Sequence, residues 1–172
     1  GFMVADPDAP LIWRGPMLHG ALNQLLHEVL WADPDGNRLD VVLIDMPPGT
    51  GDVALTLTQK AGLSGAILVT TPQDIALIDA RKAAGMFTRM EIPILGVVEN
   101  MATYCCPNCG HEEAIFGTGG GEKEAETLGV PYLGGIPLSR PIREASDMGQ
   151  GPDLTHYQDI ARTIKERAFA PH

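Results

Sequence analysis

The sequence has few cysteines and few basic residues, and each shortage excludes a class of protein. Three cysteines among 172 residues are too few, and odd in number, for the disulfide framework of a small secreted domain. Lys and Arg number 12 against 22 Asp and Glu, which gives a net charge of −10. A surface this acidic argues against binding to nucleic acid or to anionic membranes.

Long apolar runs are missing as well. No run reaches the roughly 18 residues that a membrane-spanning helix needs, and no segment has the pattern of a signal peptide. Together with the small, odd number of cysteines, these absences predict a soluble protein in a reducing compartment, the cytoplasm.

The apolar residues that are present suffice for one core. With 44% hydrophobic residues, a chain of 172 residues can build one sizeable α/β domain but not two comfortable ones. The chain opens on Gly-Phe-Met-Val rather than on an initiator Met. We therefore expect residues 1–172 to form part of a single domain whose natural start lies upstream.

Apolar runs alternate with helical stretches along the chain. Short continuous apolar runs are typical of strands that are covered on both faces, and they occur at 40–46, 65–71, 93–101 and 131–138. Helices are predicted at 14–31, 52–61, 74–90, 120–129 and 153–168. This alternation predicts an α/β fold with a parallel sheet and right-handed crossovers. Ligands on such a sheet bind at the carboxyl ends of the strands.

The run Asp-Met-Pro-Pro-Gly-Thr-Gly-Asp at 45–52 follows the first predicted strand. It is not a Walker A loop, because Asp52 stands where a phosphate-binding lysine is required. The apolar run that ends in Asp45 instead fits a Walker B strand, whose carboxylate holds Mg²⁺ directly or through water. The Pro-Pro-Gly-Thr-Gly stretch then becomes a switch loop whose glycine amides sense a γ-phosphate. A strand that ends at an exposed Asp before an ordinary turn is the simpler alternative.

Cys106 and Cys109 form a C-x-x-C, a spacing that lets two thiolates bind one metal ion from a tight turn. A tetrahedral site needs four ligands, and with His111 the segment supplies only three. Cys105 is next to Cys106, and adjacent thiols rarely chelate one ion. The pair is therefore half of a site, for zinc or for an iron–sulfur cluster, since soft thiolates bind both. A redox C-x-x-C is a further alternative, but such a pair should open a helix.

The motifs resemble, in their order, those of the Mrp/ApbC iron–sulfur cluster carrier ATPases, which are MinD/ParA-like P-loop NTPases with a deviant Walker A loop. The resemblance covers nearly the whole chain and rests on WRGPM at 13–17, DMPPGTGD at 45–52, TTPQDIALIDARK at 70–82, GVVENM at 96–101, CPNCGH at 106–111 and IPL at 136–138. It implies a three-layer, mostly parallel sheet with helices on both faces. The family's lysine-bearing P-loop and its strand would precede residue 1, so this piece alone should not hydrolyse ATP.

The resemblance also implies roles for individual residues. Asp45 would be the catalytic Walker B residue that holds Mg²⁺, and Pro47 to Asp52 would be the second switch. The switch residues that would contact the nucleotide are Gly49, Thr50, Gly51 and Asp52. Asn100 resembles the family's base-reading asparagine, since an amide can donate to and accept from an adenine edge. Read without the resemblance, Asn100 would simply close a strand into a turn. Pro137 would line the base pocket with its backbone.

The resemblance supplies the missing metal ligands from a second copy of the chain. Members of this family place one C-x-x-C per subunit at the twofold axis of a dimer. Cys106 and Cys109 of two copies would then bind one bridging [4Fe-4S] cluster through four thiolates. The implied function is an ATP-dependent, homodimeric iron–sulfur cluster carrier that delivers clusters to apo-proteins. Cys105 is expected to be a packed thiol rather than a spare ligand.

Two other functions fit parts of the sequence. One is a zinc-stabilised dimerisation module with a vestigial nucleotide site, in which zinc replaces the cluster. The other is a MinD/ParA-like positioning ATPase, against which the acidic charge and the C-x-x-C argue. In the preferred hypothesis, ATP binding and slow hydrolysis change how the two subunits meet and thereby release the cluster.

Overall fold

The computed structural model of the protein describes residues 15–33, 35–46, 51–151 and 154–168. The chain divides into two compact units, Gly1–Ala61 and Gly62–His172. The second unit holds the four-stranded sheet and the three cysteines.

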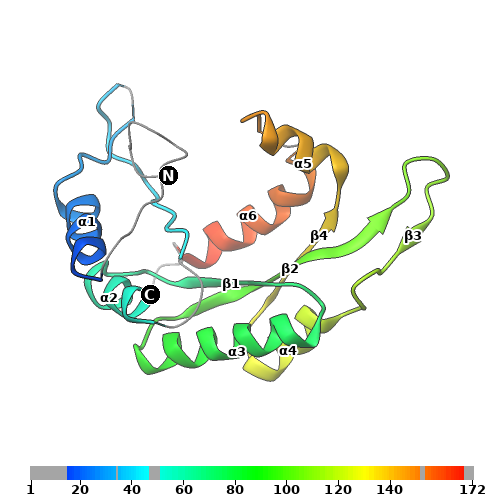
Figure 1. Ribbon diagram of the computed structural model, residues 1–172, viewed down its shortest axis with the longest axis horizontal. Coiled ribbons are helices and arrows are strands. Elements are labelled where there is room, and N and C mark those ends of the chain that lie inside the picture. Colours follow the sequence, from blue (N-terminus) through cyan, green and yellow to red (C-terminus); the bar gives the residue numbers. More distant parts are fainter. Residues whose placement is uncertain (1–14, 34, 47–50, 152–153, 169–172) are drawn as a thin grey trace. The chain divides into compact units, whose positions relative to one another are not determined.

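Three parallel strands form the centre of the second unit (Figure 1). β2 (Ile94–Cys105) lies between β1 (Ala66–Thr70) and β4 (Tyr132–Leu138) and runs parallel to both. The short strand β3 (Glu112–Glu113) pairs antiparallel with the far end of β2. The mostly parallel sheet predicted from the apolar runs is therefore confirmed, with one antiparallel addition.

Helices cover both faces of this sheet. α3 (Asp74–Arg89) packs on β1 and α4 (Gly120–Leu128) packs on β2, and the two helices contact each other on one face. α6 (Thr155–Ala168) packs against β4 and β2 on the other face. This is the predicted α/β arrangement in three layers. None of the helices within the described ranges is long and apolar enough to cross a membrane.

The centre of β2 is apolar because both of its faces are buried. On one face, Val98 of β2 packs with Leu133 of β4 and Ile160 of α6. Val97, the neighbour of Val98, has 0% exposure. α3 buries its own apolar residues Leu77, Ala80, Ala84, Met86 and Phe87. The core therefore lies on both sides of β2. This packing holds in place the strand that leads to the cysteines.

Two elements of the second unit were not predicted. β3 spans two residues, which is too short to show any periodicity. α5 (Arg140–Asp147) spans 8 residues and has no buried residue, and a segment this short gives only a weak periodic signal.

The first unit contains α1 (Gly15–His27) and α2 (Asp52–Lys60), both predicted, which contact each other. The strand predicted at 40–46 is wrong. Residues 41–46 have no regular structure, and the side chains that should be covered are open, with Leu43 82% exposed. A strand exists through hydrogen bonds to a neighbouring strand, and within the described part of the chain no strand pairs with this segment.

Candidate functional site

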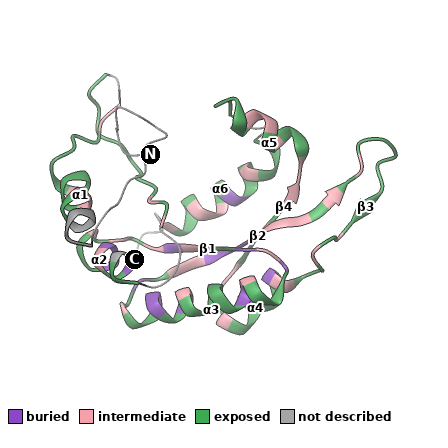
Figure 2. Cartoon of the chain, viewed as in Figure 1, coloured by how far each residue is buried: buried purple, intermediate pink, exposed green. Residues whose placement is uncertain are grey.

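The C-x-x-C lies at the tip of a hairpin that extends β2 beyond the parallel sheet. β1 ends where Thr70 pairs with Glu99, and β2 continues until Tyr104 pairs with Glu113 and Cys105 with Glu112 of β3. We call residues 104–113 the cysteine hairpin. Figure 2 shows this segment as mostly exposed, in contrast to the buried centre of β2. The predicted metal ligands thus lie on a mostly exposed hairpin and not in the core.

Two backbone hydrogen bonds close the turn that carries the cysteines. The Cys106 amide donates to the His111 carbonyl at 2.9 Å, and the Gly110 amide donates to the Cys106 carbonyl at 2.9 Å. Gly110 has φ +69°, a left-handed conformation that glycine adopts without steric cost. The residue after the second cysteine is therefore a glycine because the turn requires one.

The turn also stabilises the thiolate of Cys106. The Asn108 amide, then the Cys109 amide and the Cys109 thiol, donate hydrogen bonds to the Cys106 sulfur and hold the pKa of that thiol below its ordinary value. The thiolate is the form of cysteine that binds metals and acts as a nucleophile. The backbone of the turn thus favours the thiolate form of Cys106 and keeps Cys109 within hydrogen-bonding distance of it.

The cysteine pair is incomplete as a metal site. Within the described residues, no group of three or more His, Cys, Asp or Glu side chains is placed to hold a metal ion. His111 is exposed and does not complete such a group. That Cys106 and Cys109 supply half of a metal site stays a prediction.

Cys105 differs from its prediction. It was expected to be a packed thiol, but it is exposed, and its Sγ lies 3.8 Å from the Gly110 carbonyl oxygen. The reason is its position in the hairpin, where β2 has left the buried part of the sheet (Figure 2). The Cys105 sulfur is therefore accessible to solvent, beside the turn that carries Cys106 and Cys109.

Asn100 and Pro137, both predicted to lie near a nucleotide base, are brought together by the sheet. Asn100 pairs in register with Ile136, the residue before Pro137, one position beyond Glu99, which pairs with the last residue of β1. Both residues are half-buried. The Asn100 Oδ1 accepts a hydrogen bond of 3.0 Å from the Met101 amide. The side-chain amide of Asn100 and the backbone of Pro137 thus lie on adjacent strands, toward the edge of the sheet at which ligands of parallel α/β folds bind.

The pairing of β2 with β4 is irregular next to Asn100. β2 advances from Asn100 to Tyr104 while β4 advances only from Ile136 to Leu138. Pro137 lies in the short stretch and has no N–H to offer a neighbouring strand, which makes a bulge the natural solution. Met101, in the long stretch, has φ +56°. Sequence reasoning missed this bulge, although the proline within a strand was its signal.

Glu99 is a further site residue that sequence reasoning missed. It is 3% exposed, and the Gly121 amide in the first turn of α4 donates a hydrogen bond to its Oε2. A carboxylate at a helix N-terminus satisfies a free amide and complements the helix dipole. Glu99 thereby fastens α4, which follows the cysteine hairpin, to the central strand. The signal was a lone charge inside an apolar run.

The predicted switch residues belong to the first unit. Asp45 is exposed in the irregular segment 41–46, and Gly51 is followed directly by Asp52, the first residue of α2. Asp52 is exposed and puts its carboxylate at the helix N-terminus, where negative charge is favourable. Gly49 and Thr50, together with Pro47 and Pro48, lie outside the described residues.

Comparison with solved structures defines the class of the fold. The chain is similar to a nucleotide-binding protein from Archaeoglobus fulgidus, solved in complex with ADP, at 34% identity and a TM-score of 0.69 over 82% of this chain and 58% of that one. The cell division ATPase MinD of Pyrococcus furiosus shares the fold at 23% identity and a TM-score of 0.57, over 87% of this chain and 57% of its own. The fold is therefore that of the MinD-like P-loop NTPases.

Sequence comparison then gives the family. The model of a ParA-type family described as NUBPL iron-transfer P-loop NTPase matches residues 1–169, and the chain belongs to this family. The iron–sulfur cluster carrier protein of Escherichia coli K12 is 54% identical over 99% of this chain and 46% of its own length. The iron–sulfur cluster transfer protein NUBPL of Mus musculus is 51% identical over 87% of this chain and 45% of its own. The family resemblance predicted from the motifs is confirmed, and the chain spans about half the length of these relatives.

Proposed function

We propose that this chain acts in an ATP-dependent carrier that binds an iron–sulfur cluster between two copies of itself and passes the cluster to apo-proteins. The observation that carries the proposal is the cysteine hairpin. It presents Cys106 and Cys109 on an exposed tip, with no third ligand among the described residues. Family membership and the relatives named as cluster carriers support the same function.

A second copy supplies the missing ligands. A 4Fe–4S cluster takes four thiolates, and a C-x-x-C from each of two chains provides them at the axis of a symmetric dimer. The lowered pKa of Cys106 favours the thiolate form that this binding needs. A cluster held only at a subunit interface is open to an acceptor protein. The cluster is thus cargo, which a carrier must release and a structural site must keep.

The nucleotide part of the proposal keeps the residue roles that the family resemblance implies. Asp45, whose carboxylate is exposed, would hold Mg²⁺, and the switch residues Gly49 to Asp52 would contact the phosphates. Asn100 and Pro137 would meet the base, since they lie on adjacent strands at the ligand-binding edge. Mg²⁺, when bound, neutralises charge on the phosphates. In this proposal residues 1–172 belong to one cytoplasmic ATPase domain that hydrolyses ATP.

Anaerobic reconstitution tests the carrier function. The protein, expressed from its complete gene, is incubated with iron and sulfide, and both are counted per dimer. We expect about four iron and four sulfide, and nearly none in the Cys106→Ser and Cys109→Ser variants. Cys105→Ser is the matched control because it removes an exposed neighbouring thiol and should keep the cluster. About one zinc ion per dimer and no sulfide would contradict the carrier function and favour a zinc-stabilised dimerisation module.

A transfer assay tests the dependence on ATP. The loaded protein is mixed with an apo iron–sulfur protein, and cluster transfer is followed spectroscopically with and without Mg-ATP. Asp45→Asn should keep the cluster but remove the effect of Mg-ATP, because an amide is a poor Mg²⁺ ligand. Transfer that is equally fast with and without nucleotide in the unmodified protein would contradict the ATP-dependent part of the proposal.

A further inference from the structure

We propose that Asn100 couples nucleotide binding to the position of the cysteine hairpin. Its side-chain oxygen holds the β2 bulge at Met101 when no base is bound, and it releases the bulge when the amide engages an adenine base. The coupling rests on the proposed function, since it requires Asn100 to meet the base. It adds to that function a physical path from the nucleotide to the cysteines.

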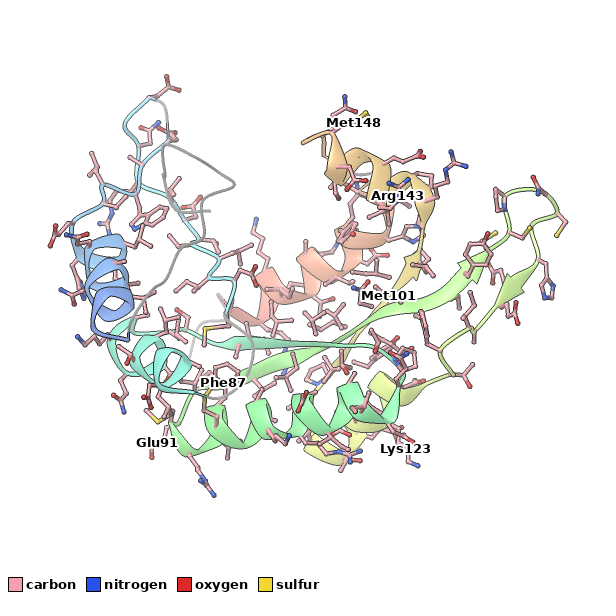
Figure 3. The ribbon with its side chains drawn as sticks, viewed as in Figure 1. Phe87, Glu91, Met101, Lys123, Arg143 and Met148 are labelled. Atoms are coloured by element: carbon pink, nitrogen blue, oxygen red, sulfur yellow. The ribbon has the colours of Figure 1, made fainter. Side chains whose placement is uncertain are left out.

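The bulge stands between the fixed and the exposed parts of β2. Up to Glu99, β2 pairs with β1, and from Val98 to Asn100 it pairs in continuous register with β4. From Tyr104 onward it pairs with β3 of the cysteine hairpin and, at that residue, with Leu138 of β4. Residues 101–103 connect the two parts, and Met101 is labelled there in Figure 3. Any change in the conformation of these residues must therefore change the direction in which the cysteine hairpin extends.

Met101 is held in a conformation that it would not adopt by itself. Its φ of +56° is in the left-handed region, which side chains with a Cβ disfavour. Such a residue persists only when its surroundings impose the conformation. The Asn100 Oδ1, 3.0 Å from the Met101 amide, is one such constraint and comes from the residue directly before it.

The bulge also rests directly on β4. A Cβ built on Gly135 would lie 2.9 Å from the Cβ of Ala102, so the absence of a side chain there lets the bulge approach. Two contacts thus constrain its conformation, the approach of Ala102 to Gly135 and the hydrogen bond that the Met101 amide donates to Asn100. Only the second involves a side chain that can also bind a ligand.

The two tasks of the Asn100 amide compete. To read an adenine edge, an asparagine must align its oxygen with a donor and its NH₂ with an acceptor of the base. Turning the amide into the plane of a base moves Oδ1 away from the Met101 amide. The constraint on Met101 is then lost, φ returns toward the extended region, and the pairing of Tyr104 with Leu138 breaks. The hairpin is released as the base is bound.

Hydrogen exchange tests this coupling, first without nucleotide. The protein expressed from its complete gene is compared with Asn100→Ala, which removes the acceptor, and Asn100→Asp, which keeps an oxygen at that position. In Asn100→Ala we expect amide exchange over residues 101–105 and at Leu138 to rise about fivefold, the factor for one net hydrogen bond. Asn100→Asp should exchange like the unmodified protein. Equal exchange in Asn100→Ala and the unmodified protein would overturn the proposal.

The second arm adds a non-hydrolysable ATP analogue, and its binding is measured separately by equilibrium dialysis. Exchange over the same residues should rise in the unmodified protein, and not with the corresponding GTP analogue, whose base offers a different edge. Asn100→Asp with analogue bound should show no rise. Bound analogue without faster exchange in the unmodified protein would overturn the coupling and leave the proposed function standing. Absence of any nucleotide binding would overturn the proposed function and the coupling with it, while the first arm would still decide whether Asn100 holds the bulge.

Discussion

The two halves of β2 have opposite surroundings although they form one strand. Residues 96–99 are all buried between the two helical layers, whereas residues 101–105 are half-buried or exposed (Figure 2). The first half makes the core of the second unit, and the second half carries the chain to Cys106 and Cys109. In the proposed function, stability and cluster chemistry are therefore separated along a single strand, so variants should affect one without the other.

This separation has a physical reason. A carrier must change the partners of its cysteines, and segments that change partners lie at the low-stability end of a structure. The cysteine hairpin makes few buried contacts, so exchanging its partners leaves the core intact. The buried half of β2 fixes the point from which the hairpin extends, so the cysteines remain in a defined place.

The largest effect on stability should come from the core. Leu68 of β1 is 3% exposed, and its neighbour Val69 is 63% exposed. Leu68→Ala should lower the free energy of unfolding by about 3 kcal/mol, because it removes buried methyl groups and leaves a cavity. Val69→Ala, the matched control on the same strand, should change it by less than about 1 kcal/mol. Urea unfolding measures both, and equal losses would show that β1 is not packed as described.

An intermediate effect should come from the ion pair that joins α3 to α4. The Glu124 side chain is 1% exposed and pairs with the half-exposed Arg81 at 2.7 Å. Arg81→Ala should lower the free energy of unfolding by about 2 kcal/mol, because it leaves the buried Glu124 carboxylate unpaired. This loss is smaller than for a fully buried pair because water can reach the carboxylate once the half-exposed Arg81 side chain is removed. Lys82→Ala is the control, since its pair with Asp79 is exposed on both sides and should contribute less than about 0.5 kcal/mol. Equal costs for the two would contradict the burial of Glu124.

The cysteine hairpin should contribute almost nothing to stability. Cys106→Ser and Cys109→Ser alter half-buried and exposed side chains, so each should change the free energy of unfolding by less than about 0.5 kcal/mol in metal-free protein. Both should still abolish cluster binding. A loss of stability as large as that of Leu68→Ala would contradict the separation of the two halves of β2.

The smallest effect concerns the protonation of Cys106. Its pKa lies below the ordinary value of 9.0 because the amides of Asn108 and Cys109 and the Cys109 thiol donate to its sulfur. The thiolate fraction rises with pH, so the alkylation rate of Cys106 should reach half its plateau at a lower pH than for an ordinary thiol. Asn108→Pro removes the main donor and should raise that midpoint, whereas Asn108→Ala keeps the amide and should not. Mass spectrometry after timed alkylation reports the midpoint, and an unchanged value in Asn108→Pro would contradict the assigned cause.

Much of the second unit could be predicted because its signals are local. The runs at 65–71, 93–101 and 131–138 became strands, since a continuous apolar run has to be covered on both faces. The C-x-x-C could be found because the number and spacing of cysteines are properties of the sequence itself, and its interpretation as half a site stays a prediction. These predictions needed no knowledge of which strand lies beside which.

The features that sequence reasoning missed all depend on a distant partner. The bulge at Met101 arises where Pro137 of β4 meets β2, and the role of Glu99 depends on the Gly121 amide of α4. The exposure of Cys105 follows from how far β2 extends past β1. The strand predicted at 40–46 failed for the same reason, because an apolar run becomes a strand only when a neighbouring strand pairs with it.

Native mass spectrometry of the reconstituted protein decides whether two chains share one cluster. After anaerobic loading, native mass spectrometry should show two chains with one 4Fe–4S cluster, and the Cys106→Ser variant should show no such species. This result would establish that two half-sites share one cluster. A loaded single chain, or a dimer that holds zinc and no sulfide, would contradict the central claim that each cysteine hairpin supplies half of a cluster site.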